Sequence, residues 1–215
     1  MRKYIPNRLA RNECLMKKLS PDFYLHPDVV HIAKELLGKM LVTNFNGKCT
    51  SGRIVETEAY AGSADKASHA YKGKTPRTTI MFEEGGSAYV YLCYGIHQMF
   101  NIVTNLKDVP HAILIRAVEP VDGIDIMLER TGKKNFDHTL TRGPGNVGKA
   151  FGFHTSQTGT RLNGEKIFIA DDGFKIKDEL IGTSPRIGVA YAAEDALLPY
   201  RFFIKGNKFV SGKIK

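Results

Sequence analysis

Polar and hydrophobic residues alternate with a period of two in the stretch 52–60, Gly-Arg-Ile-Val-Glu-Thr-Glu-Ala-Tyr. This period predicts a β-strand, because successive side chains of a strand point to opposite faces. Ile54, Glu56, Glu58 and Tyr60 are therefore expected to share one face. Two acids and a phenol would then lie side by side on that face.

A second alternating stretch, 88–95, predicts another strand rich in aromatic residues. Tyr89 and Tyr91 are expected to point to one face. Gly95 marks a turn at which Tyr94 could project beyond the sheet. One group of tyrosines would thus line a surface of the sheet, while Tyr94 leaves it.

The remaining pattern predicts short elements on both sides of these strands. Residues 28–37 show the apolar spacing of a helix, with Gly38 after its end. Asn46-Gly47 predicts a hairpin turn between strands 39–44 and 48–60, since both residues tolerate positive φ. The other expected elements are a helix at 120–131 and strands at 99–105, 111–118, 167–170, 186–191, 200–204 and 209–210.

Arg116 interrupts an almost continuous apolar run, 112–118, which is the pattern of a strand buried on both faces. A guanidinium at such a position is costly unless it is paired with a carboxylate. Glu56, Glu58 and Glu119 are the candidate partners.

Composition favours a soluble globular protein with one core. The chain has 215 residues, of which 42% are hydrophobic and 25% charged. No run approaches the roughly 18 apolar residues of a membrane span, and the basic N-terminal stretch lacks the apolar region of a signal peptide. These features predict a cytoplasmic protein, associated with the nucleoid in a bacterium, that has no membrane partner.

Cysteine and histidine spacing predicts neither a metal site nor a disulfide framework. Cys14, Cys49 and Cys93 are odd in number and far apart, and the seven histidines show no metal-ligand spacing. We expect no metal and no cofactor.

The net charge of +9 suggests a polyanionic partner, and the excess lies at the ends of the chain. Residues 1–20 carry six basic side chains and one acid, and residues 201–215 carry five basic side chains and no acid. Two solvated tails would account for the same charges. We interpret residues 1–20 as a basic flexible arm and hypothesise that this arm, Lys205 and Lys208 contact phosphates.

A glycine-rich stretch, Gly143 to Ala150, contains G-x-G-x-x-G and nearly matches a nucleotide-binding loop. Its context disagrees, because Ala150 replaces the hydroxyl that would bind Mg²⁺ and residues 138–142 do not form a buried-strand pattern. A magnesium–nucleotide enzyme is therefore the weakest interpretation. The helix start behind these glycines could still offer N–H groups to a phosphate.

From the sequence pattern alone, several candidate residues could have either a functional or a purely structural role. Either Glu56 or Glu58 could act as a general base, and alternation alone does not choose between them. His69 lies in a polar loop and could be an ordinary surface histidine. The tyrosines could equally be core or edge-strand aromatics, which strands favour.

Taken together, the motifs resemble the alkyladenine (3-methyladenine, methylpurine) DNA glycosylase family. The resemblance spans about residues 20–212, and many ordered blocks are more specific than any single motif. The blocks are 52–60, His69, 75–77 with 81–82, 89–95, Asn101, 116–120, 143–144 and 186–189.

The resemblance implies an α+β fold with a curved, largely antiparallel sheet flanked by short helices, like the C-terminal domain of formyltransferases. Residues 21–215 would form a single DNA glycosylase domain. A formyltransferase-like sheet could instead serve only as an RNA-binding platform, but Glu58 together with Arg116 counts against that reading.

The resemblance also implies a role for each site residue. Glu58 would activate a water that Arg116 and the carbonyl of Val189 help to hold. Tyr94 would wedge into the duplex, with Ile96 and His97 beside it in place of a bulkier aromatic pair. The implied base-binding residues are Tyr60, His69, Tyr91 and Asn101.

The implied activity is that of a monofunctional base-excision-repair enzyme acting on damaged double-stranded DNA. It would rotate alkylated or deaminated purines out of the duplex and hydrolyse the N-glycosidic bond. The implied lesions include 3-methyladenine, 7-methylguanine, hypoxanthine and ethenoadenine. We expect a monomer without lyase activity. The alternative is a non-catalytic binder of distorted or damaged DNA.

Overall fold

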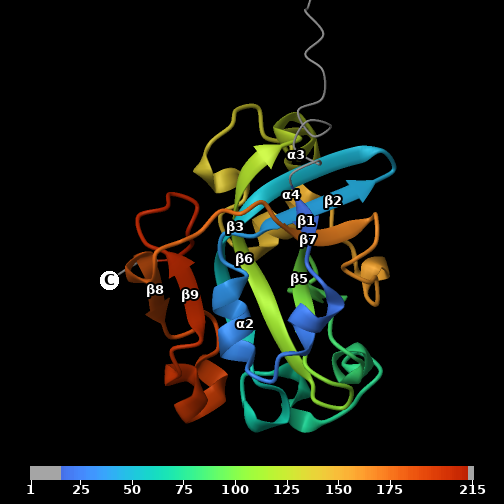
Figure 1. Cartoon of the computed structure of the whole chain (residues 1–215), viewed down its shortest axis with the longest axis vertical. Helices are drawn as coiled ribbons and strands as arrows, with labels where there is room; N and C mark the ends of the chain where they lie inside the picture. Colours follow the sequence, from blue (N-terminus) through green and yellow to red (C-terminus); the bar gives the residue numbers. More distant parts are fainter. Residues whose placement is uncertain (1–15, 213–215) are drawn as a thin grey trace, which may run out of the picture.

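The computed structural model describes residues 16–212, which form an α+β fold around one curled antiparallel sheet (Figure 1). This confirms the expected fold class. Residues 1–15, most of the expected basic arm, lie outside the described part of the chain. The strands are β1 (Lys17–Lys18), β2 (Met40–Phe45), β3 (Lys48–Tyr60), β4 (Ser87–Cys93), β5 (His97–Thr104), β6 (His111–Asp122), β7 (Ile167–Asp171), β8 (Ile181–Ser184) and β9 (Arg201–Ile204).

Short helices surround this sheet. The α-helices are α2 (Val29–Glu35), α3 (Ile124–Thr131) and α4 (Pro144–Phe151). Asp28 caps α2, because its Oδ1 accepts from the backbone N–H groups of Val30 and His31. The 3-10 helices are η1 (Pro21–Leu25), η2 (Gly62–Ala64), η3 (His69–Lys72), η4 (Thr79–Phe82), η5 (His138–Leu140), η6 (Thr155–Gln157), η7 (Asp178–Leu180) and η8 (Ala190–Leu197).

The long strand β3 is the centre of the sheet. The strand order is β1-β7-β2-β3-β6-β5-β4, with β9 also on β3 and β8 on β9. β6 occupies one edge of β3, whereas β2 and then β9 share the other edge, with β9 pairing at Glu56 to Glu58. The expected hairpin at Asn46-Gly47 joins β2 to β3. Two strands, β6 and β9, therefore hold the acid-bearing part of β3.

A bulge corrects one expectation about the faces of β3. The pairing with β6 shifts between Ile54 and Glu56, which leaves Val55 as an extra residue. Ile54 consequently joins the main core with Ala59, away from the acids. Glu58 and Tyr60 keep their common face, as alternation predicts.

The expected helix at 120–131 is wrong at its start. β6 continues to Asp122, and Pro120 pairs with Gly52. The helix α3 begins only after Gly123, whose φ of 71° supplies the sharp turn. Proline is tolerated in a strand at a bulge, and the register of β3 with β6 shifts between Ser51 and Gly52, opposite Pro120.

The expected strands at 186–191 and 209–210 are not present. Ile187 donates its N–H to a side chain rather than to a strand, and Gly188 has a φ of 81°. Two short strands, β1 and β8, were not predicted. Lys17 and Lys18 pair with Asp171 and Ala170, so this part of the expected arm belongs to the sheet.

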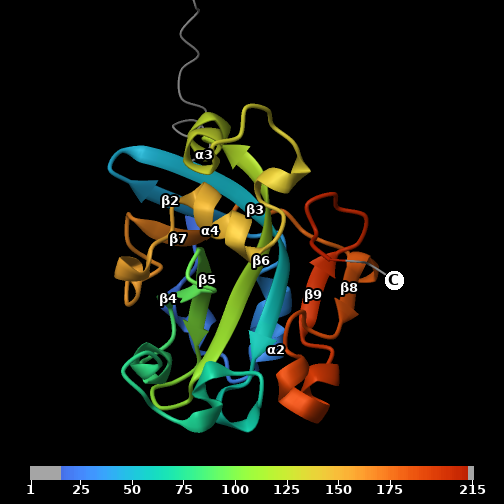
Figure 2. The same cartoon turned by 180° about the vertical axis from the view of Figure 1, so that it is seen from behind.

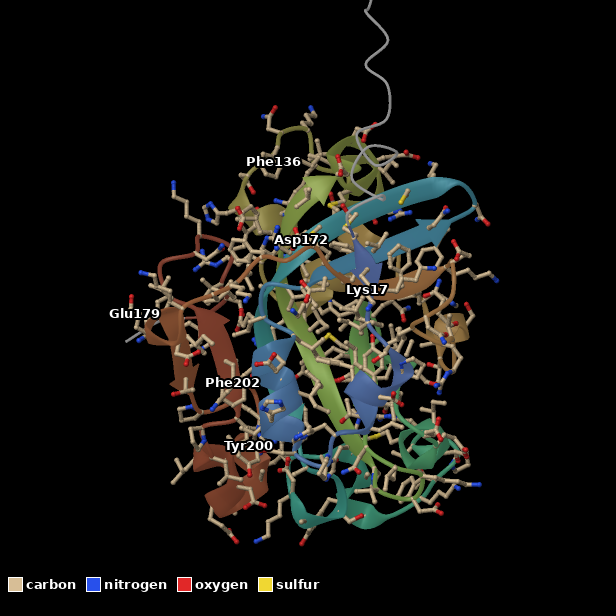
Figure 3. All side chains as sticks on the ribbon, in the orientation of Figure 1. Lys17, Phe136, Asp172, Glu179, Tyr200 and Phe202 are labelled. Atoms are coloured by element: carbon tan, nitrogen blue, oxygen red, sulfur yellow. The ribbon has the colours of Figure 1, made fainter. Side chains whose placement is uncertain are left out.

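The two faces of the central strands have different coverings. One face packs on α2, where Thr57 donates its hydroxyl to the carbonyl of Ala33. Phe202, labelled in Figure 3, belongs to the same buried cluster. The opposite face carries Glu58 and Tyr60, and Figure 2 shows the molecule from this side, with α2 behind the sheet.

The glycines of α4 allow a close approach of this helix to β5. A Cβ on Gly148 would lie 1.8 Å from the carbonyl oxygen of Gln98, and one on Gly145 would lie 2.6 Å from Nδ1 of His97. The glycine-rich stretch is therefore explained by helix–strand packing.

We predict that Gly148→Ala destabilises the fold by about 2 kcal/mol or more, because the added methyl meets backbone that cannot move cheaply. Helix propensity alone would favour alanine by about 1 kcal/mol, so the clash decides the sign. Chemical denaturation would measure the change. Gly164→Ala, whose Cβ would have no contact closer than 3.5 Å, is the control; equal stability of both variants would contradict the prediction.

Candidate active site

A cavity of about 460 Å³ opens on the sheet face opposite α2. Its floor comes from β3 to β6, and its rim comes from the segments 67–69 and 187–191. Its lining combines tyrosine and aliphatic side chains with a few polar and charged groups, as in sites that receive organic ligands. The lining residues are Tyr60, Ala67, Ser68, His69, Arg77, Met81, Tyr89, Tyr91, Leu92, Cys93, Tyr94, Met99, Asn101, Ala112, Leu114, Arg116, Pro144, Ile187, Gly188, Val189 and Tyr191.

Glu58 lies directly behind the lining of this cavity and is fully buried. Its Oε2 accepts from the Tyr60 hydroxyl at 2.7 Å, and its Oε1 accepts from the Ile187 N–H at 2.7 Å. Nη1 of Arg116 lies 3.2 Å from Oε1. All three partners line the cavity, so the carboxylate is one side chain away from any ligand.

Glu56 is equally buried but has no contact with the lining except through Arg116. Its Oε1 accepts from Nε of Arg116 at 2.8 Å, Nε of Arg201 at 2.7 Å and the Ser211 hydroxyl at 2.9 Å. Its Oε2 accepts from the Ser211 N–H at 2.6 Å. Glu56 is therefore occupied by structural partners, whereas Glu58 faces the cavity lining.

Arg116 bridges the two acids, as the need for a buried partner predicts. Burial alone would lower the pKa of Arg116, but the charges of Glu58 and Glu56 more than offset it and raise the pKa. The third candidate, Glu119, accepts a hydrogen bond from Asn207 instead. The guanidinium is thus fixed at the floor of the cavity.

Aromatic rings form one wall of the cavity. The rings of His69 and Tyr91 are 4.6 Å apart and nearly perpendicular, and Tyr89 lies 5.5 Å from Tyr91. No base can enter between His69 and Tyr91, because these rings are already in contact. They line the cavity as one wall, and Tyr60 lines it from β3.

His69 is held as a neutral imidazole. Nη2 of Arg77 lies 2.8 Å from its Nε2, and the Tyr89 hydroxyl lies 2.9 Å from its Nδ1. Burial, and then the positive charge of Arg77, lower the pKa of His69 to about 4. Arg77 itself stacks over Tyr91 at 5.2 Å. The signal for Arg77 was its place in the motif 75–77, although the residue pattern gave it no role.

Asn101 lies on the cavity floor with a fixed amide. Its Nδ2 donates to the carbonyls of Tyr89 and Met99, both at 3.2 Å. The side chain is 4% exposed and lines the cavity. This geometry leaves the amide oxygen as the group that a ligand could meet.

Tyr94 stands at the mouth of the cavity, on the β4–β5 turn. Its side chain is 90% exposed, and Ile96 beside it is 73% exposed. Tyr94 has a φ of 50°, a left-handed conformation that costs a non-glycine residue about 1 kcal/mol. His97 begins β5 and lies near Gly145. The exposed tip of this turn is therefore apolar and strained.

The structure brings most of the expected site residues to one cavity, with Glu58 directly behind its lining, whereas Ile96 and His97 are not among the lining residues; those in the lining are Tyr60, His69, Tyr91, Tyr94, Asn101, Arg116 and Val189. Val189 is almost fully buried and lines the cavity. It lies two residues after Ile187, whose N–H donates to Glu58. Tyr191 and Arg186 had no expected role. Within residues 16–212, no group of three metal-binding side chains occurs, and no helix has the length and apolarity to span a membrane.

The fold and the site together define an α+β protein with a curled antiparallel sheet and a buried acid directly behind a tyrosine-containing cavity. A family model for methylpurine-DNA glycosylase matches residues 22–208. The chain belongs to this family, as its motifs predict.

Relatives cover nearly the whole chain. A Chlamydia felis protein is 46% identical over 192 residues, covering 88% of this chain and 97% of its own length. A Clostridium perfringens protein is 42% identical over 205 residues, with coverages of 91% and 100%. A Chlorobaculum tepidum protein is 42% identical over 197 residues, covering 91% of this chain and 91% of its own length. All three are named as candidate 3-methyladenine DNA glycosylases.

We predict that His69 stays neutral down to about pH 4 and that Arg77→Gln raises its pKa by removing a nearby positive charge. Burial remains in the variant, so the pKa should stay below 6.5. Because the pKa of His69 is lower in the folded than in the unfolded state, the contribution of His69 to the free energy of unfolding decreases as the pH falls from 6.5 toward 4. NMR titration of the imidazole would test both points; an unchanged pKa in the variant would contradict the role of Arg77.

Proposed function

We propose that this protein is a monofunctional DNA glycosylase that removes alkylated or deaminated purines from double-stranded DNA. The observation that carries the proposal is Glu58, a buried carboxylate whose three partners line an aromatic cavity. The family match supports DNA as the substrate, and the names of the relatives support 3-methyladenine among the lesions.

The nucleotide would be rotated out of the duplex before reaction, because a stacked purine cannot reach a buried acid. Rotation costs a few kcal/mol, and less for a damaged pair. Tyr94 would fill the vacated space, with Ile96 and His97 next to it. The exposure of the Tyr94 ring supports this role.

The flipped base would stack between Tyr60 and the wall of His69 and Tyr91. Burial, followed by the charge of Glu58, raises the pKa of Tyr60 well above its usual value, so Tyr60 remains a neutral phenol. With His69 also neutral, the stacking groups favour a cationic alkylated purine through their π faces. Asn101, whose amide is held by two carbonyls, would occupy the space at the base edge and thereby exclude the exocyclic amine of guanine sterically.

Hydrolysis would use a water held by Glu58, Arg116 and the carbonyl of Val189. Oε2 of Glu58 accepts a hydrogen bond from the Tyr60 hydroxyl and would use its second lone pair to accept from this water. The water oxygen bonds to C1′ of the sugar, the N-glycosidic bond breaks with its electrons going to the base, and Glu58 takes the water's proton. A neutral base such as hypoxanthine would also need protonation as it leaves.

Other features of the cavity support hydrolysis without strand cleavage. A lyase requires an amine that attacks the sugar, and no lysine is among the described lining residues. We propose a monomer that acts on damaged duplex DNA. The basic arm and Lys208 remain candidates for phosphate contacts, and so does Lys205, whose Nζ also donates to the carbonyl of Glu179.

We predict that Glu58→Gln lowers single-turnover release of hypoxanthine or an alkylated adenine about 10²- to 10⁴-fold, the usual contribution of a general base. Duplexes with one lesion would be scored for alkali-labile sites, and binding would be measured on the same duplexes. Binding should be retained, because glutamine keeps the shape of the side chain.

Glu56→Gln is the matched control on the same strand. It leaves Arg116 and Arg201 short of a buried counter-charge and should lower stability by about 3–5 kcal/mol, while the rate per folded molecule stays closer to wild type. Full activity of Glu58→Gln would exclude Glu58 as the base. Lesion binding by wild type without release would favour the non-catalytic binder.

We predict that Tyr94→Gly weakens binding to a lesion duplex at least about tenfold, since each stacked aromatic contributes about 1–3 kcal/mol. The same change should not lower the free energy of unfolding and should raise it by up to about 1 kcal/mol, because glycine accepts positive φ. Ile96→Ala, on the same turn, is the control. Unchanged affinity of Tyr94→Gly would contradict the wedge.

A further inference from the structure

Arg186 is a buried residue without a role in the proposed reaction, and its guanidinium donates four hydrogen bonds. Its Nη1 donates to Oδ2 of Asp65 at 2.5 Å and to the carbonyl of Ala59 at 2.9 Å. Its Nη2 donates to Oδ1 of Asp65 at 2.8 Å and to the carbonyl of Asp195 at 3.1 Å. The pair is bidentate and almost inaccessible to solvent. Such a fork fixes both position and orientation.

The guanidinium of Arg186 also stacks on Tyr60. Its central carbon lies 4.8 Å from the centre of the Tyr60 ring and 5.3 Å from that of Tyr200. Tyr60 lines the cavity, whereas Arg186 does not. Arg186 therefore supports the Tyr60 ring from outside the cavity.

The next residue carries the contact to the acid. Ile187 donates its N–H to Oε1 of Glu58 at 2.7 Å. Val189, whose carbonyl is assigned to the water, follows two residues later. Fixing the Arg186 side chain thus fixes the backbone that meets Glu58.

Asp65 extends the same support to the segment that leads to His69. Its Oδ2 accepts from the N–H of Ala61 at 3.0 Å and its Oδ1 from that of Ala67 at 3.0 Å. The carboxylate therefore organises the loop between Tyr60 and His69. Both cavity walls are connected to this one ion pair.

Further contacts join the two loops across the cavity rim. The Tyr191 hydroxyl donates to the carbonyl of Ala67 at 3.0 Å, and the N–H of Lys66 donates to Asp195 at 2.8 Å. In Figures 1 and 2, η8 and the segment with η2 and η3 lie at the same end of the molecule. Arg186 and Asp65 form the buried centre of this connection.

We infer that Arg186 and Asp65 are a positioning pair that holds the base-stacking walls in register with Glu58. The inference rests on the proposed function and adds to it a residue pair that touches neither base nor sugar. Loss of the Arg186–Asp65 pair should displace the stacked base relative to Glu58. A displacement of about 1 Å can lower a reaction rate about 10²-fold. Arginine is required for its planar fork and stacking surface, which lysine lacks.

The decisive variant is Arg186→Lys, which keeps the positive charge opposite Asp65. We expect single-turnover base release at saturating enzyme to fall about 10- to 100-fold. Affinity for a duplex with a stable abasic analogue should stay within about twofold, because that ligand places no base between the walls. A fluorescent purine at the lesion position should lose less emission on binding than with wild type. Asp65→Asn, which keeps the shape but weakens the pair, should shift the same readouts in the same direction.

Asp172→Asn is the matched control. It weakens another bidentate pair, in which Arg53 of β3 donates to Asp172 at 2.7 and 3.1 Å, away from the cavity lining. It should change thermal stability without changing base release or fluorescence. A purely structural role would make stability, abasic-site affinity and release fall together in Arg186→Lys, and that result would overturn the inference, as would wild-type release.

The two proposals fail in distinguishable ways. If wild type releases no base, the glycosylase proposal fails. The fluorescence of the bound purine still reports whether Arg186 positions the stacking walls. If wild type releases the base and Arg186→Lys matches it in both rate and fluorescence, only the positioning role fails.

Discussion

Arg116 lies between Glu56 and Glu58 in the interior of the sheet, and this buried charge cluster constrains the rest of the site. Two acids from β3 meet guanidinium groups from β6 and β9, with Ser211 completing the partners of Glu56. Removing any one charge leaves another uncompensated in a dry environment, which costs several kcal/mol. The bulge in β3, the shared edge with β9 and the return of the C-terminal segment are all needed to assemble it. The cluster therefore ties the topology of the sheet to the position of the acid.

The cluster also separates the roles of two acids that are only two residues apart. Glu56 accepts four hydrogen bonds, and three of them come from Arg201 and Ser211, which do not line the cavity. Glu58 accepts from groups that line the cavity, and one of them, the Tyr60 hydroxyl, belongs to a ring that a ligand would contact. A ligand can therefore change the surroundings of Glu58 without disturbing Glu56.

Much of this arrangement could be predicted from regular alternation. The pattern placed Tyr89 and Tyr91 on one face of β4, left Tyr94 at the turn, and required a carboxylate for Arg116, and the structure confirms all three. Prediction failed where backbone departs from alternation. The bulge at Val55 moved Ile54 to the other face, and residues 186–191 form no strand, with the N–H of Ile187 donating to the side chain of Glu58. Alternation gave no preference between Glu56 and Glu58, because their difference lies in partners distant in sequence. The roles of the site residues in catalysis remain predictions.

The proposed reaction follows from which parts of the molecule can move. Glu58 is held between two neighbouring strands and in a charge cluster, so it cannot swing out to a base inside a duplex. The base must then travel to the acid, and the duplex must be opened for it. The strained, exposed turn at Tyr94 lies outside the charge cluster, where a tyrosine at positive φ costs about 1 kcal/mol and does not disturb the core. The rigid Glu58 and the projecting Tyr94 ring thus serve the same requirement: the base must leave the stack and meet the buried carboxylate in the cavity.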